Sequence, residues 1–108
     1  MIQTTTDNIP GFEVKEVIGV VRGNSVKAKW FGADIGAALK SIVGGELRAY
    51  QDLMSQAREQ AIREMAKDAR KLKADAIINI RFTTSQISPG AAEILVYGTA
   101  VLLEKNER

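Results

Sequence analysis

Apolar residues recur every three or four positions between Glu46 and Lys73, and this stretch contains neither Gly nor Pro. The spacing predicts one uninterrupted helix. At 1.5 Å per residue such a helix extends over about 42 Å. A compact chain of 108 residues has a radius of gyration of about 13 Å and therefore a diameter of roughly 34 Å. Because the helix is longer than the compact monomer, we expect other subunits to cover part of it.

The apolar side of this helix is flat at its centre. Ala57 and Ala61 occupy the middle of the stripe, and small side chains allow a sheet or a second helix to approach closely. The stripe consists of Leu47, Tyr50, Leu53, Met54, Ala57, Ala61, Met65, Ala69 and Leu72. The charged side is typical of a solvated face.

Two later segments show the alternation of a β-strand. Residues Ala76–Thr84 alternate apolar and polar positions, and Glu93–Leu103 resume the pattern after Ser88, Pro89 and Gly90. Together they predict an antiparallel hairpin. If the turn centres on Pro89, Ile80 lies opposite Gly98 and Arg81 lies opposite Tyr97, which keeps the apolar sets on one side of the sheet.

The N-terminal part is β-prone as well. Ile2–Thr6 predict a short edge strand, and Phe12–Val26 favour a longer strand with a bulge where the alternation breaks at Glu16 and Val17. Gly23 and Asn24 predict a turn inside this segment. Ser25–Trp30 then form either a second short strand or a loop.

A shorter helix is predicted between these regions, over Ala33–Val43, where apolar residues are at helical spacing and Gly44 and Gly45 follow. With 108 residues the chain is large enough for one core, so residues 1–108 are expected to form a single domain.

The amino-acid composition limits the kinds of ligand and catalytic group that the chain can use. The net charge is +2, from 15 basic and 13 acidic residues with no long run of either sign, so no nucleic-acid partner is expected. The chain has no Cys and no His, which excludes disulfides, thiolate nucleophiles, imidazole bases and the preferred ligands of zinc and copper. No segment resembles a leader or a membrane span, and we expect a cytoplasmic protein.

Several ordered pieces resemble the YbjQ family of small bacterial proteins over nearly the whole chain. Glu16, Gly19, Gly23 and the segment 34–37 fall where the family has such residues. The more specific pieces are Gly44-Gly45-Glu46 followed by Tyr50, Ala57-Arg58, Arg81-Phe82, and Tyr97-Gly98-Thr99-Ala100-Val101.

The resemblance implies a two-layer α+β subunit of the dodecin and YbjQ kind, with an antiparallel sheet on the long helix. It also implies a homo-oligomeric ring, usually a pentamer and otherwise a decamer. The family carries a heavy-metal-binding label without an agreed activity, and the lack of Cys and His argues against soft metals here. Lys73 stands where the family tends to have Gly, so the turn after the helix is expected to differ.

Five polar residues on the predicted strands are the candidate ligand-binding residues: Glu16, Asn79, Arg81, Tyr97 and Thr99. Under the predicted register, the last four share one sheet face. Arg81 suits an anion, and Glu16 suits a cation or a proton. The alternative is that these residues form hydrogen bonds and ion pairs that determine how subunits meet.

Three functional hypotheses follow. The first is a non-enzymatic, ring-forming scaffold that holds a small ligand, a metal ion or an anion, among its subunits. The second is an enzyme with a subunit-shared active site, in which Glu16 is the base and Arg81 the electrophilic partner. The third is an adaptor whose exposed helix face binds another protein. No cofactor is predicted, and no catalytic residue is assigned.

Overall fold

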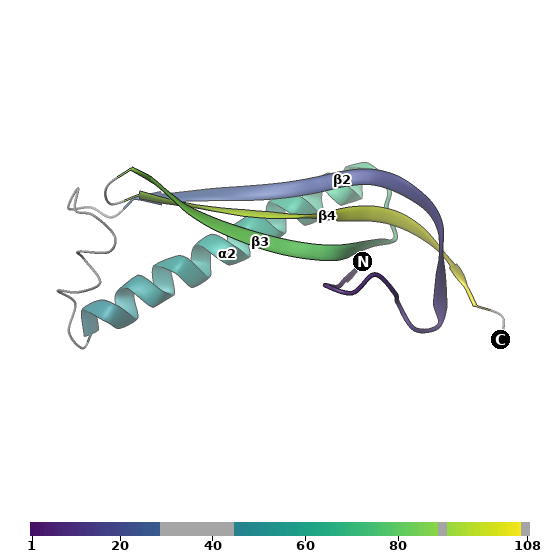
Figure 1. The fold of residues 1–108 in the computed structure, drawn as a ribbon, viewed down its shortest axis with the longest axis horizontal. Helices are drawn as coiled ribbons and strands as arrows, with labels where there is room; N and C mark the ends of the chain where they lie inside the picture. The colour runs from purple at the N-terminus through teal and green to yellow at the C-terminus, as the bar shows by residue number, and fades with distance from the viewer. Residues whose placement is uncertain (29–44, 89–90, 107–108) are drawn as a thin grey trace.

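The computed structural model describes residues 1–28, 45–88 and 91–106. These residues form a four-stranded sheet with the strand order β1-β3-β4-β2, and one helix, α2, lies across one face of it (Figure 1). The elements are β1 (Ile2–Gln3), β2 (Phe12–Ala28), α2 (Gly45–Lys71), β3 (Ala76–Ser88) and β4 (Ala91–Lys105). The predicted two-layer α+β class is confirmed for this part of the chain.

The predicted edge strand exists, but it makes the sheet mixed. β1 pairs with β3 in parallel, whereas the expectation was an antiparallel sheet. The reason is that the N-terminal segment runs beside β3 in the same direction. The Thr4 amide donates to the Ile77 carbonyl at 3.0 Å, and the Ile80 amide donates to the Thr4 carbonyl at 3.1 Å.

β2 is a single strand of 17 residues, and the turn predicted at Gly23 and Asn24 is wrong. Both residues lie inside the antiparallel ladder, where Gly23 pairs with Val96 and Asn24 with Leu95. The bulge predicted near Glu16 and Val17 is confirmed, because the register shifts between Val14 and Glu16 and again between Val17 and Gly19.

The predicted β3–β4 hairpin forms, with Arg81 opposite Tyr97 as expected. The predicted pairing of Ile80 with Gly98 is replaced by a bulge. The ladder shifts between Ile78 and Arg81, and Asn79 adopts a left-handed conformation with φ 55°. Two residues, Asn79 and Ile80, therefore stand against Gly98 alone. The turn around Pro89 lies outside the described residues.

Helix α2 has 27 residues and matches the predicted long helix. It ends in a Schellman motif: the Ala74 amide donates to the Ala69 carbonyl at 3.1 Å, and the Lys73 amide to the Arg70 carbonyl at 3.0 Å. Lys73 takes the left-handed position with φ 59°.

In the part of the chain that the structure describes, no helix is long and apolar enough to cross a membrane. The helix predicted over Ala33–Val43 lies outside the described residues.

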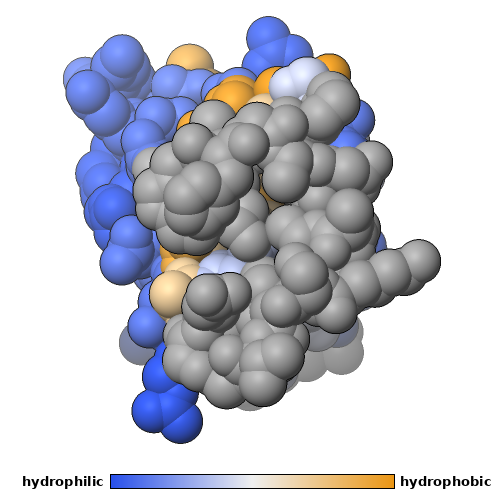
Figure 2. Space-filling view, turned by 90° about the vertical axis from the view of Figure 1, so that its left-hand side faces the viewer, coloured by the Kyte–Doolittle hydropathy of each residue, from blue (hydrophilic) through white to orange (hydrophobic). Residues whose placement is uncertain are grey.

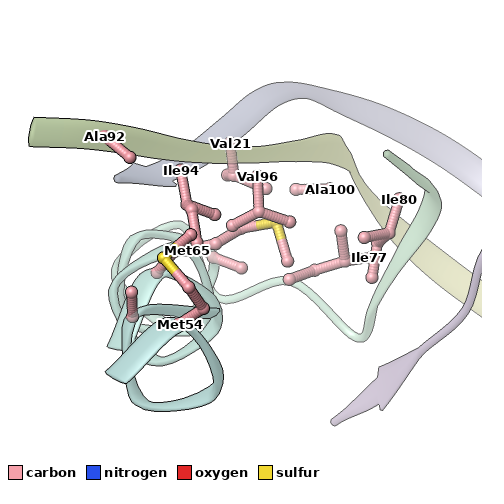
Figure 3. Close-up of a cluster of buried hydrophobic side chains, with 12 residues drawn as sticks. Val21, Met54, Met65, Ile77, Ile80, Ala92, Ile94, Val96 and Ala100 are labelled. Atoms are coloured by element: carbon pink, nitrogen blue, oxygen red, sulfur yellow. The ribbon is translucent and has the colours of Figure 1, made fainter. Parts of the chain in front are cut away.

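The core lies between α2 and the sheet (Figure 3). Met54 and Met65 reach from the helix toward Ile94 and Val96 of β4 and Val21 of β2. The central alanines of the predicted stripe are buried, but Leu72, one residue past the end of α2, is 46% exposed. The flexible side chains of these two methionines fill the irregular gaps that the small alanine side chains leave between helix and sheet.

Gly23 is the point where α2 comes closest to the sheet. A Cβ atom at this position would overlap the Ala61 carbonyl oxygen and would lie 2.7 Å from the Met65 backbone nitrogen. Since both groups belong to the helix backbone, they cannot swing aside as a side chain does. Gly23 of β2 and the small Ala61 therefore set the distance between the layers.

The subunit is elongated. Its radius of gyration is 17.4 Å and its principal extents are 56 × 23 × 15 Å, whereas a compact chain of this length has a radius of gyration of about 13 Å. The view along the long axis shows hydrophilic residues over one flank and hydrophobic residues beside it (Figure 2). A thin, long subunit has too little depth to bury both faces of its sheet.

We expect Gly23→Ala to lower the free energy of unfolding by about 2–4 kcal/mol, because the added methyl group meets helix backbone and forces the layers apart. Urea denaturation followed by circular dichroism measures this change. Ser85→Thr, which adds one methyl group at an exposed position of β3, is the control and should change stability by less than about 0.5 kcal/mol. An equal loss in both variants would contradict the close-approach explanation.

We expect Lys73→Gly to raise the free energy of unfolding by about 0.5–1 kcal/mol, because glycine adopts the left-handed conformation without steric cost. Lys71→Gly removes the same side chain from the last helical residue, and it should lower stability by about 1 kcal/mol. Thermal unfolding of the two variants distinguishes the positions, since a general effect of charge removal would shift both in the same direction.

Candidate functional site

The two faces of the sheet differ in what covers them. On β4, Ala92, Ile94, Val96 and Ala100 face α2, so the alternate residues point away from the helix. We call that side the outer face. At one end it is covered by the N-terminal segment, where Ile9 packs against a small cluster formed by Ala76, Ile78, Val101 and Leu103. α2 does not cover the rest of it.

Arg81, Tyr97 and Arg22 form a row across three strands of the outer face. Tyr97 of β4 pairs with Arg81 of β3 on one side and with Arg22 of β2 on the other. Cross-strand partners project from the same face, so Arg81 and Arg22 stand on either side of Tyr97 in this row. All three side chains are exposed, and Tyr97 is 42% exposed. We call this set the arginine–tyrosine row.

Backbone carbonyl groups anchor the Arg81 side chain. Its Nη1 donates to the Thr5 carbonyl at 2.8 Å and to the Ile80 carbonyl at 2.9 Å. The guanidinium thereby joins the N-terminal segment to β3. Among the described residues, no carboxylate pairs with Arg81 or Arg22. The row therefore carries two positive charges that this part of the chain does not neutralise.

Thr99 lies one row further along the same face. It pairs with Val20 of β2 and with the buried Ile78 of β3. Its hydroxyl is half-buried and stands between an apolar cluster and the open surface. Three of the predicted site residues, Arg81, Tyr97 and Thr99, are thus on one face, as the register predicted.

The other two predicted site residues stand apart. Asn79 is in the bulge, where it has no cross-strand partner, and its amide donates to the Thr6 carbonyl at 3.0 Å. The predicted register therefore does not hold at Asn79, which the ladder pairs with no residue of β4. Glu16 is exposed and pairs with Leu102, which lies on the helix side of the sheet. Within one chain, Glu16 and Arg81 are therefore on opposite faces.

Arg22 is the member of the row that the sequence analysis missed. The predicted turn at Gly23 and Asn24 places Arg22 at the end of a strand. At that position the sequence assigns it no cross-strand partner. The available signal was the alternation of Val20, Arg22, Asn24 and Val26, which continues through the glycine.

The edge strand β2 exposes valines beside this row. Val17, Val20 and Val26 are 63%, 75% and 50% exposed, and each pairs with a β4 residue of the outer face: Val101, Thr99 and Glu93 respectively. Val14 belongs to the same series and pairs with Leu103. An apolar strip thus runs along β2 and is interrupted by Arg22 and Asn24.

An open groove lies between the edge of β2 and α2. It has a volume of 340 Å³ and is lined by Arg22, Gly23, Asn24, Glu64, Lys67, Asp68 and Lys71. Glu64 of α2 accepts a hydrogen bond of 3.3 Å from the Asn24 backbone amide. The helix thus satisfies a donor at the open edge of the sheet, and the mixed charges indicate a solvated groove.

Comparison with known proteins gives a consistent picture. A sequence model of the YbjQ family, described as "Putative heavy-metal-binding", matches residues 1–104. The chain is 50% identical to a UPF0145 protein of Thermosipho africanus over 106 residues, which is 98% of either chain. It is 53% identical to a UPF0145 protein of Thermotoga maritima over 105 residues, covering 97% of this chain and 99% of the relative.

A UPF0145 protein of Archaeoglobus fulgidus is 55% identical over 103 residues, 95% of each chain. Among solved structures, a protein of unknown function of the DUF74 family from Pediococcus pentosaceus aligns with a TM-score of 0.64 and 21% identity. The alignment covers 96% of this chain and 98% of that one. At this level of identity the likeness concerns the fold alone.

The residues of this chain do not fit a soft heavy metal. The whole sequence contains no Cys and no His, and the described residues contain no group of three or more Asp and Glu placed to hold a metal ion. Thiolate and imidazole are the ligands that such metals prefer. The most prominent charged feature of the outer face, the arginine–tyrosine row, repels cations.

We expect Arg81→Ala to loosen the N-terminal segment, because the anchoring hydrogen bonds to Thr5 and Ile80 are lost. Each such bond stabilises by about 1–2 kcal/mol, so amide exchange in residues 2–6 should become about tenfold faster. Hydrogen exchange with mass spectrometry measures this rate. Arg22→Ala removes the other arginine of the row without touching that segment and should leave it unchanged. Equal exchange in wild type and Arg81→Ala would contradict the anchoring role.

Proposed function

The chain belongs to the YbjQ family, and we propose that it is a non-enzymatic scaffold that assembles with copies of itself and binds a small ligand between them. The observation that supports this proposal is the exposed valine strip of β2, in which Val17 and Val20 are 63% and 75% exposed. Single exposed apolar residues are ordinary, but the run Val14, Val17 and Val20 places three of them in succession on one sheet face, and such a patch marks an interaction surface.

Burial of this strip favours association. Removing one valine side chain from water stabilises by about 1.5–3 kcal/mol, and the strip contains Val14, Val17, Val20 and Val26. Tyr97 and the two arginines beside it are residue types that are enriched at protein interfaces. The outer face of β2 is therefore the surface that a second copy of the chain is expected to cover.

The edges of the sheet support association in a head-to-tail manner. β2 is the last strand on one side of the sheet. On the other side, β1 pairs with only the first two residues of β3, and backbone hydrogen bonds from the N-terminal segment continue only to Ile80. Both edges are long strand edges that favour pairing with another chain. Two different edges meeting repeatedly generate a ring if the rotation closes.

The outer face provides groups that can bind a ligand. Within one chain, the candidate base for acid–base catalysis does not lie on that face. Arg22 and Arg81 are permanently charged donors, and Glu16, the candidate base, lies on the opposite face. An active site that uses Glu16 and Arg81 together needs the carboxylate of one subunit and the guanidinium of another. Binding requires only the row that a single chain already presents, so we favour binding over catalysis.

We expect the protein to elute as a homo-oligomer whose mass is a multiple of the 11.8 kDa chain, with a pentamer or decamer as the expected species. Val20→Lys should reduce this mass, because a charge replaces the most exposed valine of the strip. Size-exclusion chromatography with light scattering measures both. Gln56→Lys adds the same charge on the exposed side of α2 and is the control, expected to assemble as wild type.

A monomer of wild-type protein at micromolar concentration would refute the assembly. If wild type assembles but Val20→Lys and Gln56→Lys both assemble normally, the valine strip is not the interface and the proposal loses its supporting observation.

A further inference from the structure

We propose that the arginine–tyrosine row is a binding site for an oxyanion, a phosphate or carboxylate group, and that the ligand of this chain is therefore an anion and not a heavy-metal cation. This inference rests on the proposed function in that it names the chemical class of the small ligand. It concerns Arg22, Tyr97 and Arg81, which the cross-strand register places side by side.

The local charge favours an anion. Arg22 and Arg81 flank Tyr97, and the nearest acidic residue of the outer face on β4, Glu93, is four residues along the strand, a distance of about 13 Å. The Glu93 carboxylate also accepts a hydrogen bond of 3.4 Å from the Asn24 side-chain amide. The groove that Arg22 also lines contains two basic and two acidic residues of α2, Lys67, Lys71, Glu64 and Asp68.

The spacing places one arginine on either side of Tyr97. Neighbouring strands are about 4.8 Å apart, so the Cα atoms of Arg22 and Arg81 are about 10 Å apart. Each guanidinium presents donors in a planar fork that matches the two oxygens of a carboxylate or phosphate. The Tyr97 hydroxyl between them is a further donor.

Arg81 is prepared for this role before any ligand arrives. Its Nη1 is held by the Thr5 and Ile80 carbonyls at 2.8 and 2.9 Å, while its Nη2 and Nε have no partner among the described residues. Fixing a long side chain in advance lowers the entropic cost of binding. In an isolated surface arginine, the donor that makes these two bonds is hydrated by water.

Proximity to the valine strip explains why the site belongs to the assembly. Arg22 lies on β2 between Val20 and Val26, so a copy that covers the strip borders the row. Exclusion of water at that border strengthens the attraction between arginine and anion, since charges interact more strongly in a lower dielectric. Burial of two unpaired arginines is costly, and burial with an oxyanion that accepts their hydrogen bonds costs less.

The test is isothermal titration of the intact protein with sodium phosphate and with sodium citrate, each against sodium chloride of equal ionic strength, and with cadmium chloride in a separate arm. We expect saturable binding of phosphate or citrate, and the tighter of the two identifies the preferred oxyanion. Arg22→Gln and Arg81→Gln should each weaken it by at least about tenfold, because each removes a charge-assisted hydrogen bond.

Arg63→Gln removes an exposed arginine of α2, outside the row, and should bind as wild type. Arg22→Gln keeps the inference testable if Arg81→Gln does not fold, since Arg22 makes no anchoring bond within the described residues. Three results would overturn the inference: no saturable anion binding, equal weakening by Arg63→Gln, or cadmium binding that is tighter than either anion.

Light scattering on the same samples separates this inference from the proposed function. An assembled protein that binds neither phosphate nor citrate refutes the anion site and leaves the scaffold intact. A monomeric protein that binds an oxyanion through both arginines refutes the scaffold and leaves the site.

Discussion

The close approach of α2 to β2 at Gly23 is the constraint on which the rest of the structure depends. No side chain separates the strand from the helix there, and the Ala61 carbonyl occupies the space that a Cβ atom would need. With the layers this close, small residues and two flexible methionines suffice to fill the core. The subunit is consequently only 15 Å deep along its shortest axis. A low aromatic content, 6% of the chain, is what such a thin core requires.

In the part of the chain that the structure describes, the two faces of the sheet are covered unequally. On the helix side, β4 is buried at Ala92, Ile94 and Val96, whereas on the outer side the described residues cover the end near Ile9. The strand β2 lies at the edge and has apolar residues on both faces, which is typical of a strand that is buried twice. One burial is supplied by α2. Among the described residues, no element covers the other face of β2, and this asymmetry is the basis of the proposed association.

The sequence was sufficient to predict the elements whose pattern is periodic and long. The helix from Gly45 to Lys71 and the Arg81–Tyr97 pairing follow from spacing alone, because side-chain periodicity reflects which face is buried. It failed where a residue has two roles. Gly23 is a residue type that is common in turns, but here it allows α2 to approach β2 closely. This contact is visible only in the tertiary structure. The same error concealed Arg22. The bulge at Asn79 and the parallel direction of β1 depend on long-range hydrogen bonds to Thr4 and Thr6, which no local pattern encodes.

The heavy-metal label of the family and the residues of this chain point to different chemistry. A label is inherited by every sequence that shares the fold, whereas a binding site depends on particular side chains. The fold requires Gly23, Gly98 and the alanine stripe, because these positions bring backbone and side chains into contact. It does not require a charged residue at position 22, where the side chain is exposed, whereas Arg81 also anchors the N-terminal segment through the Thr5 and Ile80 carbonyls. Two arginines beside one tyrosine, in a chain without Cys or His, are better suited to an anion than to a metal.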